Sequence, residues 1–231
     1  MRQAQLGELL ECIRRRQPVL TVTNLASGDV HLVRAEVVGS EGRLAGDLRE
    51  ALRTDKARTV KTEEGDVFIN VFNPPLRMLM VGAVHISQAL IPLAERAGYD
   101  VTVVDPRTAF ATPERFAGVR LVAEWPDEVI PTLGLDRRTA VILLTHDPKI
   151  DDPALKLALK SDAFYIGALG STRTHAKRIE RMQAAGFDGR ELARIHAPIG
   201  LDIGAVGPVE IALSIMAEVT AVLRGRGDRS K

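Results

Sequence analysis

The sequence predicts an α/β protein in which a doubly wound parallel sheet follows a small N-terminal module of mixed α and β structure. Three observations support this class. Residues 77–107 read as a strand, a tight glycine turn, a helix, a second strand and an acidic residue. From Met78 onward, strand patterns alternate with helical ones. Between the two parts, Asn73-Pro74-Pro75 interrupts regular structure, so we place the domain boundary between residues 73 and 74.

The N-terminal module, residues 1–73, is expected to fold as helix, strand, strand, helix and strand. These elements are predicted at residues 4–16, 19–25, 30–37, 46–53 and 67–72. Leucines at helical spacing indicate the first helix, and Pro18 ends it. Alternating apolar and polar residues on both sides of Ser27-Gly28-Asp29 indicate a hairpin.

The larger part, residues 74–231, is expected to form a Rossmann-like sheet. Its strands are predicted at residues 77–81, 101–105, 119–123, 140–145 and 163–167. Its helices are predicted at residues 86–97, 113–117, 126–132, 152–160, 171–185 and 208–223. Three helix starts carry a capping residue before a proline, at Thr112-Pro113, Asp152-Pro153 and Gly207-Pro208. The strands are nearly continuous apolar runs, as burial on both faces requires, and 3-2-1-4-5 is the economical sheet order.

Composition argues against several classes of function. The formal net charge is +1, so the sequence gives no electrostatic case for binding nucleic acid or an anionic membrane. The single cysteine, Cys12, excludes an internal disulfide and indicates a reducing compartment. Residues 78–93 are too short and too interrupted to span a membrane, and no signal peptide is recognised. We therefore expect a cytoplasmic protein whose basic tail, residues 224–231, is a frayed end.

The loop after the first parallel strand is the first candidate binding site. Gly82 permits the sharp turn, and the helix that starts near His85 offers free backbone N–H groups to an anion. Asp105 ends the second strand, where dinucleotide-binding proteins bind a ribose hydroxyl, and Arg107 could instead contact a phosphate. Val84 replaces the middle glycine of the usual fingerprint, so its Cβ would obstruct a pyrophosphate. A plain turn with a surface aspartate is the alternative.

Two further loops should lie at the same edge of the sheet. The fourth strand ends at His146, Asp147 and Lys149, which we expect to face the first loop at the topological switch point. A polar loop in which Asp147 caps a turn is the alternative. The fifth strand ends in a second anion cradle, whose candidate binding residues are Gly170, Ser171 and Arg173. The cations that follow it are interpreted as an exposed helix face, namely Lys177, Arg178 and Arg181.

Residues 195–204 form an irregular run that contains His196 and Asp202. The run is either a loop that covers a site or a buried strand and turn, and the sequence does not choose between them. The histidines come from separate loops without metal-ligand spacing, so no metal site is predicted. No serine lies in a nucleophile elbow, so no catalytic residue is predicted either.

The loop sequences together resemble the xanthine dehydrogenase accessory family, XdhC/CoxI. The matching strings cover about residues 74–216 and are PPLRMLMVGAVHISQAL, YDVTVVDPRTAFATPERF, EWPDE, THDPKIDDPAL, FYIGALGSTRTHAKR and IHAPIGLDIGA. The resemblance implies a non-catalytic role, in which members bind molybdenum cofactor and deliver it to a molybdenum hydroxylase such as xanthine dehydrogenase or carbon monoxide dehydrogenase. It also implies a cysteine desulfurase as a further partner.

If the resemblance holds, the predicted residues divide between the phosphate and the pterin of molybdopterin. The helix starts at His85 and Ser171 would bind the phosphate, with Arg107, Lys149 and Arg173 neutralising it. The pterin would contact Asp105, Asp147 and Asp202. One departure concerns the glycine-glycine-cysteine segment common in the family, where residues 44–48 read LAGDL without a cysteine.

Two other functions remain open from sequence. The chain could be an NAD(P)-dependent oxidoreductase that uses the same crevice, or a docking module whose crevice is vestigial. Both sheet edges need cover, so a homo-oligomer is expected as well.

Overall fold

The computed structural model describes residues 2–40, 42–63 and 65–225. It contains two compact units, Met1–Pro74 and Pro75–Lys231. Each unit has a sheet and a hydrophobic core of its own. The α/β class, with a parallel sheet after a small α+β module, is confirmed.

The first unit is a four-stranded antiparallel sheet in the order β2-β1-β4-β3. Its elements are α1 Gln3–Arg14, β1 Val19–Asn24, β2 Val30–Arg34, the 3-10 helices η1 Ala35–Ser40 and η2 Gly42–Leu44, α2 Ala45–Thr54, β3 Arg58–Thr62 and β4 Gly65–Phe72. The strand β3 was not predicted. Its sequence RTVKT has one aliphatic residue and lies at the sheet edge, so its pairing with β4 defines it more than its hydrophobicity does.

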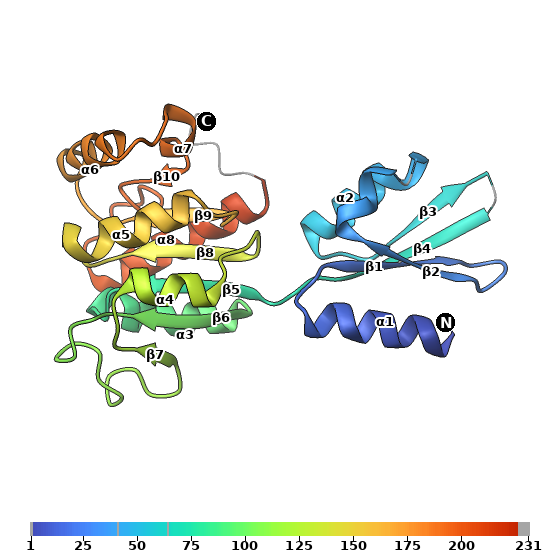
Figure 1. Cartoon of the computed structure of the whole chain (residues 1–231), viewed down its shortest axis with the longest axis horizontal. Helices are drawn as coiled ribbons and strands as arrows, with labels where there is room; N and C mark the ends of the chain where they lie inside the picture. The colour runs from blue at the N-terminus through green and yellow to red at the C-terminus, as the bar shows by residue number, and fades with distance from the viewer. Residues whose placement is uncertain (1, 41, 64, 226–231) are drawn as a thin grey trace. The chain divides into compact units, whose positions relative to one another are not determined.

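Alternation along β1 places a different helix on each face of this sheet. Leu20 packs with Leu48 of α2 in one buried cluster. Val19, its neighbour on the strand, packs with Leu9 and Cys12 of α1 in another. Figure 1 accordingly shows α1 and α2 on opposite faces of the sheet. This is the outcome that a period of two residues requires.

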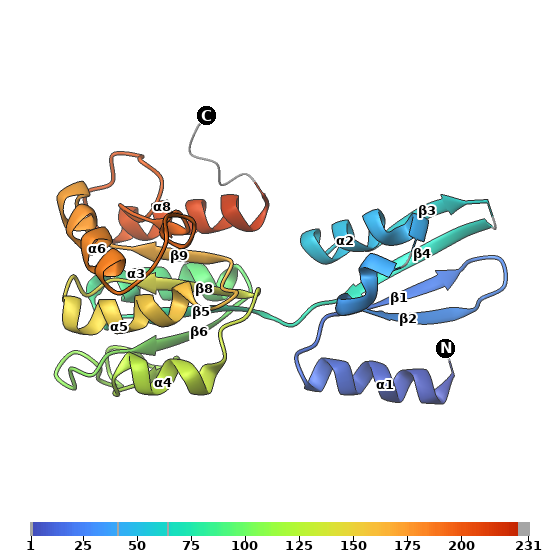
Figure 2. The same ribbon diagram turned by 45° about the horizontal axis from the view of Figure 1, so that its top comes forward.

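The second unit is a six-stranded parallel sheet in the order β10-β9-β8-β5-β6-β7. Its strands are β5 Leu76–Val81, β6 Tyr99–Val104, β7 Arg120–Val122, β8 Thr139–Leu143, β9 Tyr165–Ala168 and β10 Ile195–His196. Its helices are α3 His85–Arg96, α4 Pro126–Leu133, α5 Pro148–Leu159, α6 Thr172–Ala184, α7 Gly189–Leu192 and α8 Pro208–Leu223. Figure 2 shows β9, β8, β5 and β6 side by side. The predicted order is confirmed, and β10 adds a sixth strand.

Helices cover both faces of the parallel sheet. Leu90 of α3 and Ile215 of α8 share a buried cluster with alternate residues of the strands. Leu155 of α5 and Met182 of α6 belong to the cluster on the other face, with Val129 of α4. The carboxyl ends of the strands therefore meet at one edge between two helical layers, where ligands bind in open α/β sheets.

One helix prediction was wrong, and another placed the start of its helix four residues too late. Residues 113–117 make turns, in which Arg115 and Phe116 donate to the Thr112 carbonyl, and Gly118 at φ +82° stops further winding. The helix predicted at residues 152–160 begins at Pro148, because Asp147 supplies the cap, and Pro153 lies inside the helix. The short helix α7 was not predicted. No helix among the described residues is long and apolar enough to cross a membrane.

Candidate functional site

The first loop depends on a glycine. Gly82 has φ +118°, and a Cβ there would lie 2.9 Å from Cγ2 of Thr145. The Ser87 hydroxyl donates to the Gly82 carbonyl and accepts from the Val84 N–H at 3.3 Å. The loop is thus folded tightly against the end of β8, and α3 starts at the exposed His85.

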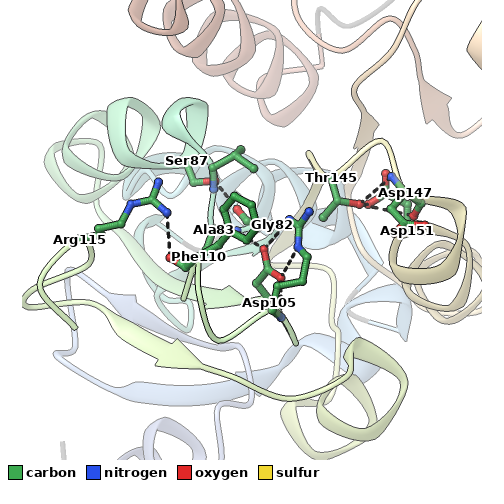
Figure 3. A network of polar contacts seen from close by, with 11 residues as sticks. Gly82, Ala83, Ser87, Asp105, Phe110, Arg115, Thr145, Asp147 and Asp151 are labelled. Carbon is green, nitrogen blue, oxygen red and sulfur yellow. Dashed lines mark hydrogen bonds and ion pairs between the residues drawn. The ribbon is translucent and has the colours of Figure 1, made fainter. Parts of the chain in front are cut away.

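Asp105 braces this loop. Its carboxylate is fully buried and accepts the Ala83 N–H at 2.7 Å. It also accepts the Arg107 backbone N–H at 3.0 Å and the guanidinium Nε and Nη2 at 2.9 and 2.7 Å. Burial alone would raise the pKa of Asp105, but these hydrogen bonds and the Arg107 charge lower it below its usual value. Figure 3 shows Asp105 pointing toward the turn at Gly82 and Ala83. A ligand would meet Arg107 rather than this occupied carboxylate.

The end of β8 forms a second polar group, centred on Thr145. Its hydroxyl donates to Oδ1 of Asp151 at 2.6 Å and accepts the Asp147 N–H at 3.1 Å (Figure 3). Asp147 caps α5 by accepting the Lys149 N–H at 2.9 Å. Between them, His146 takes a left-handed backbone with φ +59° and is exposed. Such a conformation is costly for a residue with a Cβ, so the surrounding contacts hold it.

The loop after β9 is a compact helix start. Gly170 has φ +136°, and a Cβ there would lie 2.9 Å from Cγ2 of Thr174. The Ser171 hydroxyl caps α6 by accepting the Thr174 N–H at 3.2 Å. Arg173, in the first turn, is exposed. The predicted cap and helix start are confirmed.

The start of α5 and one side of α6 enclose a pocket of about 300 Å³. Its lining residues are His146, Pro148, Asp151, Arg173, Thr174, Lys177, Arg178 and Arg181. This described lining contains four cationic side chains and one carboxylate. Of the residues predicted for binding, the structure brings His146 and Arg173 together here. The pocket is therefore suited to an anion.

Two cations predicted on an exposed helix face are instead buried or paired. Arg178 is 2% exposed, and its Nη2 donates to the Leu169 carbonyl at 2.8 Å. Its Nε and Nη1 are buried without a hydrogen-bond partner among the described residues. Arg181 forms a two-point ion pair with Asp152, at 2.5 and 2.9 Å. The helical spacing did indicate that Arg178 faces inward, because it places Arg178 on the same face of α6 as Thr174 and the apolar Met182.

Asp151 is the counter-charge within the pocket. It is 2% exposed, and its Oδ2 has no hydrogen-bond partner in the described part of the chain. Burial raises the pKa of Asp151, although the Thr145 hydrogen bond and the Arg178 charge oppose this. Burial likewise lowers the pKa of Arg178, while Asp151 and Asp152 raise it. Sequence reasoning missed Asp151, because its importance comes from burial beside α6.

His196 belongs to a separate network. Its Nδ1 lies 3.2 Å from Oε1 of Glu218 on α8, and its ring stacks on Tyr165 at 4.7 Å. Oε2 of Glu218 accepts the Tyr165 hydroxyl at 2.5 Å and the Gly200 N–H at 2.8 Å. The run at 195–204 therefore begins as a buried strand and turn, one of the two alternatives left open by sequence. Its later residues are exposed, including Asp202.

The remaining predicted residues do not line the pocket. They are Gly82, His85, Asp105, Arg107, Asp147, Lys149, Gly170, Ser171, His196 and Asp202. Several of them shape the loops around it, as described above. Within the described ranges, no group of three or more His, Cys, Asp or Glu residues could hold a metal ion.

The parallel sheet with helices on both faces defines a Rossmann-type domain. The family model described as the XdhC Rossmann domain matches residues 78–219. The chain belongs to this family, and the resemblance predicted from the loop strings is confirmed.

The curated proteins that are similar in sequence include two bacterial ones with informative names. The molybdenum cofactor insertion chaperone PaoD of Escherichia coli K12 is 34% identical over 151 residues, which are 65% of this chain and 41% of PaoD. A probable xanthine dehydrogenase subunit of Bacillus subtilis 168 is 29% identical over 182 residues, 75% of this chain and 53% of the relative. The chain thus spans about half or less of these relatives.

The fold is also found among solved structures. The crystal structure of a xanthine dehydrogenase from Bacillus halodurans has a TM-score of 0.68 and 21% identity. The match covers 99% of this chain and 66% of that one. At this identity the likeness concerns the fold alone.

Proposed function

We propose that this protein acts in the maturation of a molybdenum enzyme, by binding molybdenum cofactor and delivering it to a molybdenum hydroxylase. Membership of the XdhC family and the name of the relative PaoD support molybdenum cofactor as the ligand. The name of the Bacillus subtilis relative supports a hydroxylase of the xanthine dehydrogenase type as the target. A carbon monoxide dehydrogenase is the other target that the sequence resemblance suggests.

The observation that carries this proposal is the cationic pocket at the start of α5 and α6. Molybdopterin bears a phosphate, and cationic side chains bind phosphate through strong, charge-assisted hydrogen bonds. Arg173 and Lys177 are exposed and reachable, while Arg178 holds buried donors that have no partner in the described chain. The pocket volume, about 300 Å³, lies at the small end of ligand sites. It suits the phosphate end of the cofactor, with the pterin extending outward.

The geometry favours this function over NAD(P)-dependent oxidoreduction. In a dinucleotide enzyme, the acidic residue after the second strand binds a ribose hydroxyl. Here Asp105 is fully buried, and its oxygens already accept the Ala83 N–H and three donors of Arg107. The spacing between Gly82 and Asp105 suggested an NAD(P)-binding site. In the structure, this spacing places the Asp105 carboxylate where it braces the loop that contains Gly82.

Cofactor binding can be tested directly on the purified protein. The protein is loaded anaerobically with molybdenum cofactor, and bound pterin is measured by fluorescence after oxidation. Arg173→Glu should weaken binding about tenfold or more, because a charge-assisted hydrogen bond contributes about 1.5–3 kcal/mol. Arg190→Glu reverses an exposed arginine outside the pocket and should bind as the wild type does. No saturable binding by the wild type would refute the proposal.

Delivery needs a separate assay. The loaded protein is mixed with a cofactor-free hydroxylase, and enzyme activity is followed over time. Activation faster than that by free cofactor is the expected result, and equal rates would argue against delivery. The sequence also predicts a homo-oligomer and a cytoplasmic location, and the family resemblance implies a desulfurase partner. These belong to the same proposal; sizing tests the oligomer, a pull-down tests the partner, and cell fractionation tests the location.

A further inference from the structure

We infer that the pocket between α5 and α6 is a phosphate-binding site in which the buried Arg178 is the anchor and Asp151 tempers the affinity. This inference deepens the proposed function, on which it rests, by naming the group of the cargo that binds here. The ligand class is a small molecule that carries a phosphate group.

Arg178 is buried with two of its donor atoms unpaired in the described chain. A buried charge is costly unless it is paired and hydrogen-bonded. Arg178 is 2% exposed, yet only Nη2 has a partner, the Leu169 carbonyl. Its Nε and Nη1 are buried without a partner in the described chain, although the residue lines the pocket. Oxygens of a bound phosphate would supply the missing acceptors.

Cationic side chains are evenly spaced along α6. Arg173, Lys177 and Arg181 follow each other at intervals of four residues, so their side chains form one stripe. Like charges at this spacing repel each other and destabilise a helix. Asp152 pairs with Arg181. In the described chain, no ion pair neutralises Arg173 or Lys177, so a phosphate would relieve a repulsion that is already present.

Asp151 and Arg178 both line the pocket, and no hydrogen bond or ion pair joins them in the described chain. Each charge shifts the pKa of the other group, but Oδ2 of Asp151 and Nε and Nη1 of Arg178 find no partner among the described residues. Asp151 is instead held by the Thr145 hydroxyl, on the loop that packs against Gly82. A bound phosphate would fill the pocket on which both residues border. The carboxylate would then repel it and limit its affinity, which suits a cargo that must be released.

Two variants with opposite expected effects test this assignment. Arg178→Met keeps an apolar stem of similar length and should weaken phosphate binding about tenfold or more. Asp151→Asn keeps an oxygen that can accept from Thr145 but removes the negative charge, so phosphate should bind several-fold more tightly. Arg190→Met, an exposed site outside the pocket, should change nothing. A purely structural role would make both pocket variants weaker binders.

The measurement is calorimetric titration of the full chain with inorganic phosphate, and separately with pyrophosphate. Saturable phosphate binding that is weaker in Arg178→Met and tighter in Asp151→Asn than in the wild type supports the site. If pyrophosphate binds more tightly than phosphate, the site still stands, and its preferred ligand carries a diphosphate. Lys177→Met provides a variant at an exposed position, should Arg178→Met fail to fold, and should weaken binding severalfold. Phosphate affinities that are unchanged in Lys177→Met and Asp151→Asn would overturn the inference.

The same variants separate this inference from the proposed function. If Arg178→Met binds molybdenum cofactor as tightly as the wild type, the phosphate site is wrong while the function stands. If phosphate binds in the expected order but molybdenum cofactor does not bind, the site stands and the proposed function falls.

Discussion

Removing the Asp105 carboxylate should destabilise the second unit strongly, because this one group holds the first loop to the second strand. In Asp105→Ala, the fully buried Ala83 loses the acceptor of its N–H, which costs about 1–3 kcal/mol. Arg107 loses three hydrogen bonds, but its side chain is 31% exposed and water replaces part of them. The expected loss is about 2–4 kcal/mol in the free energy of unfolding, from the unsatisfied Ala83 N–H and the part of the Arg107 hydrogen bonding that water does not replace.

Urea denaturation followed by tryptophan fluorescence measures this loss. Trp125 is the only tryptophan in the sequence and lies in the second unit, so its emission reports unfolding of that unit. With a urea slope of about 2–3 kcal/mol per molar, the midpoint should fall by about 1–2 M. Asp100→Ala changes an exposed aspartate on the same strand and should stay within about 0.5 kcal/mol of the wild type. A loss below about 1 kcal/mol in Asp105→Ala would refute the bracing role.

Two further predictions concern buried carboxylates. The folded-state pKa of Asp105 lies below its unfolded value near 3.8, so its stabilisation is complete above that pH and is lost as the pH falls through the folded value. Urea midpoints measured across the acid range should therefore fall less steeply in Asp105→Asn than in the wild type, and parallel curves would contradict this. Glu218→Ala removes the acceptor for Tyr165 and Gly200, so it should destabilise the unit by about 2–4 kcal/mol and speed amide exchange at Gly200. Unchanged exchange there would show that Glu218 does not hold the turn.

The local structure of the loops around the candidate site followed from sequence. The glycine at the first turn, the serine cap of α6 and the exposed Arg173 were each recognised from their neighbours along the chain. Asp151 and Arg178 could not be recognised in this way. Their burial depends on the packing of α5 against α6, and a helical pattern alone does not tell whether a polar residue on the inner face is solvated.

By itself, the sequence determined the fold class and the strand order. Apolar runs separated by helical patterns require a parallel sheet, and right-handed crossovers leave few ways to order its strands. Only the tertiary structure decided which charges pair and which remain buried without a partner. The contacts that settle this connect residues far apart in the chain, as Ala83 with Asp105 and Asp152 with Arg181. Their energies depend on burial and distance in space, which periodicity along the chain does not encode.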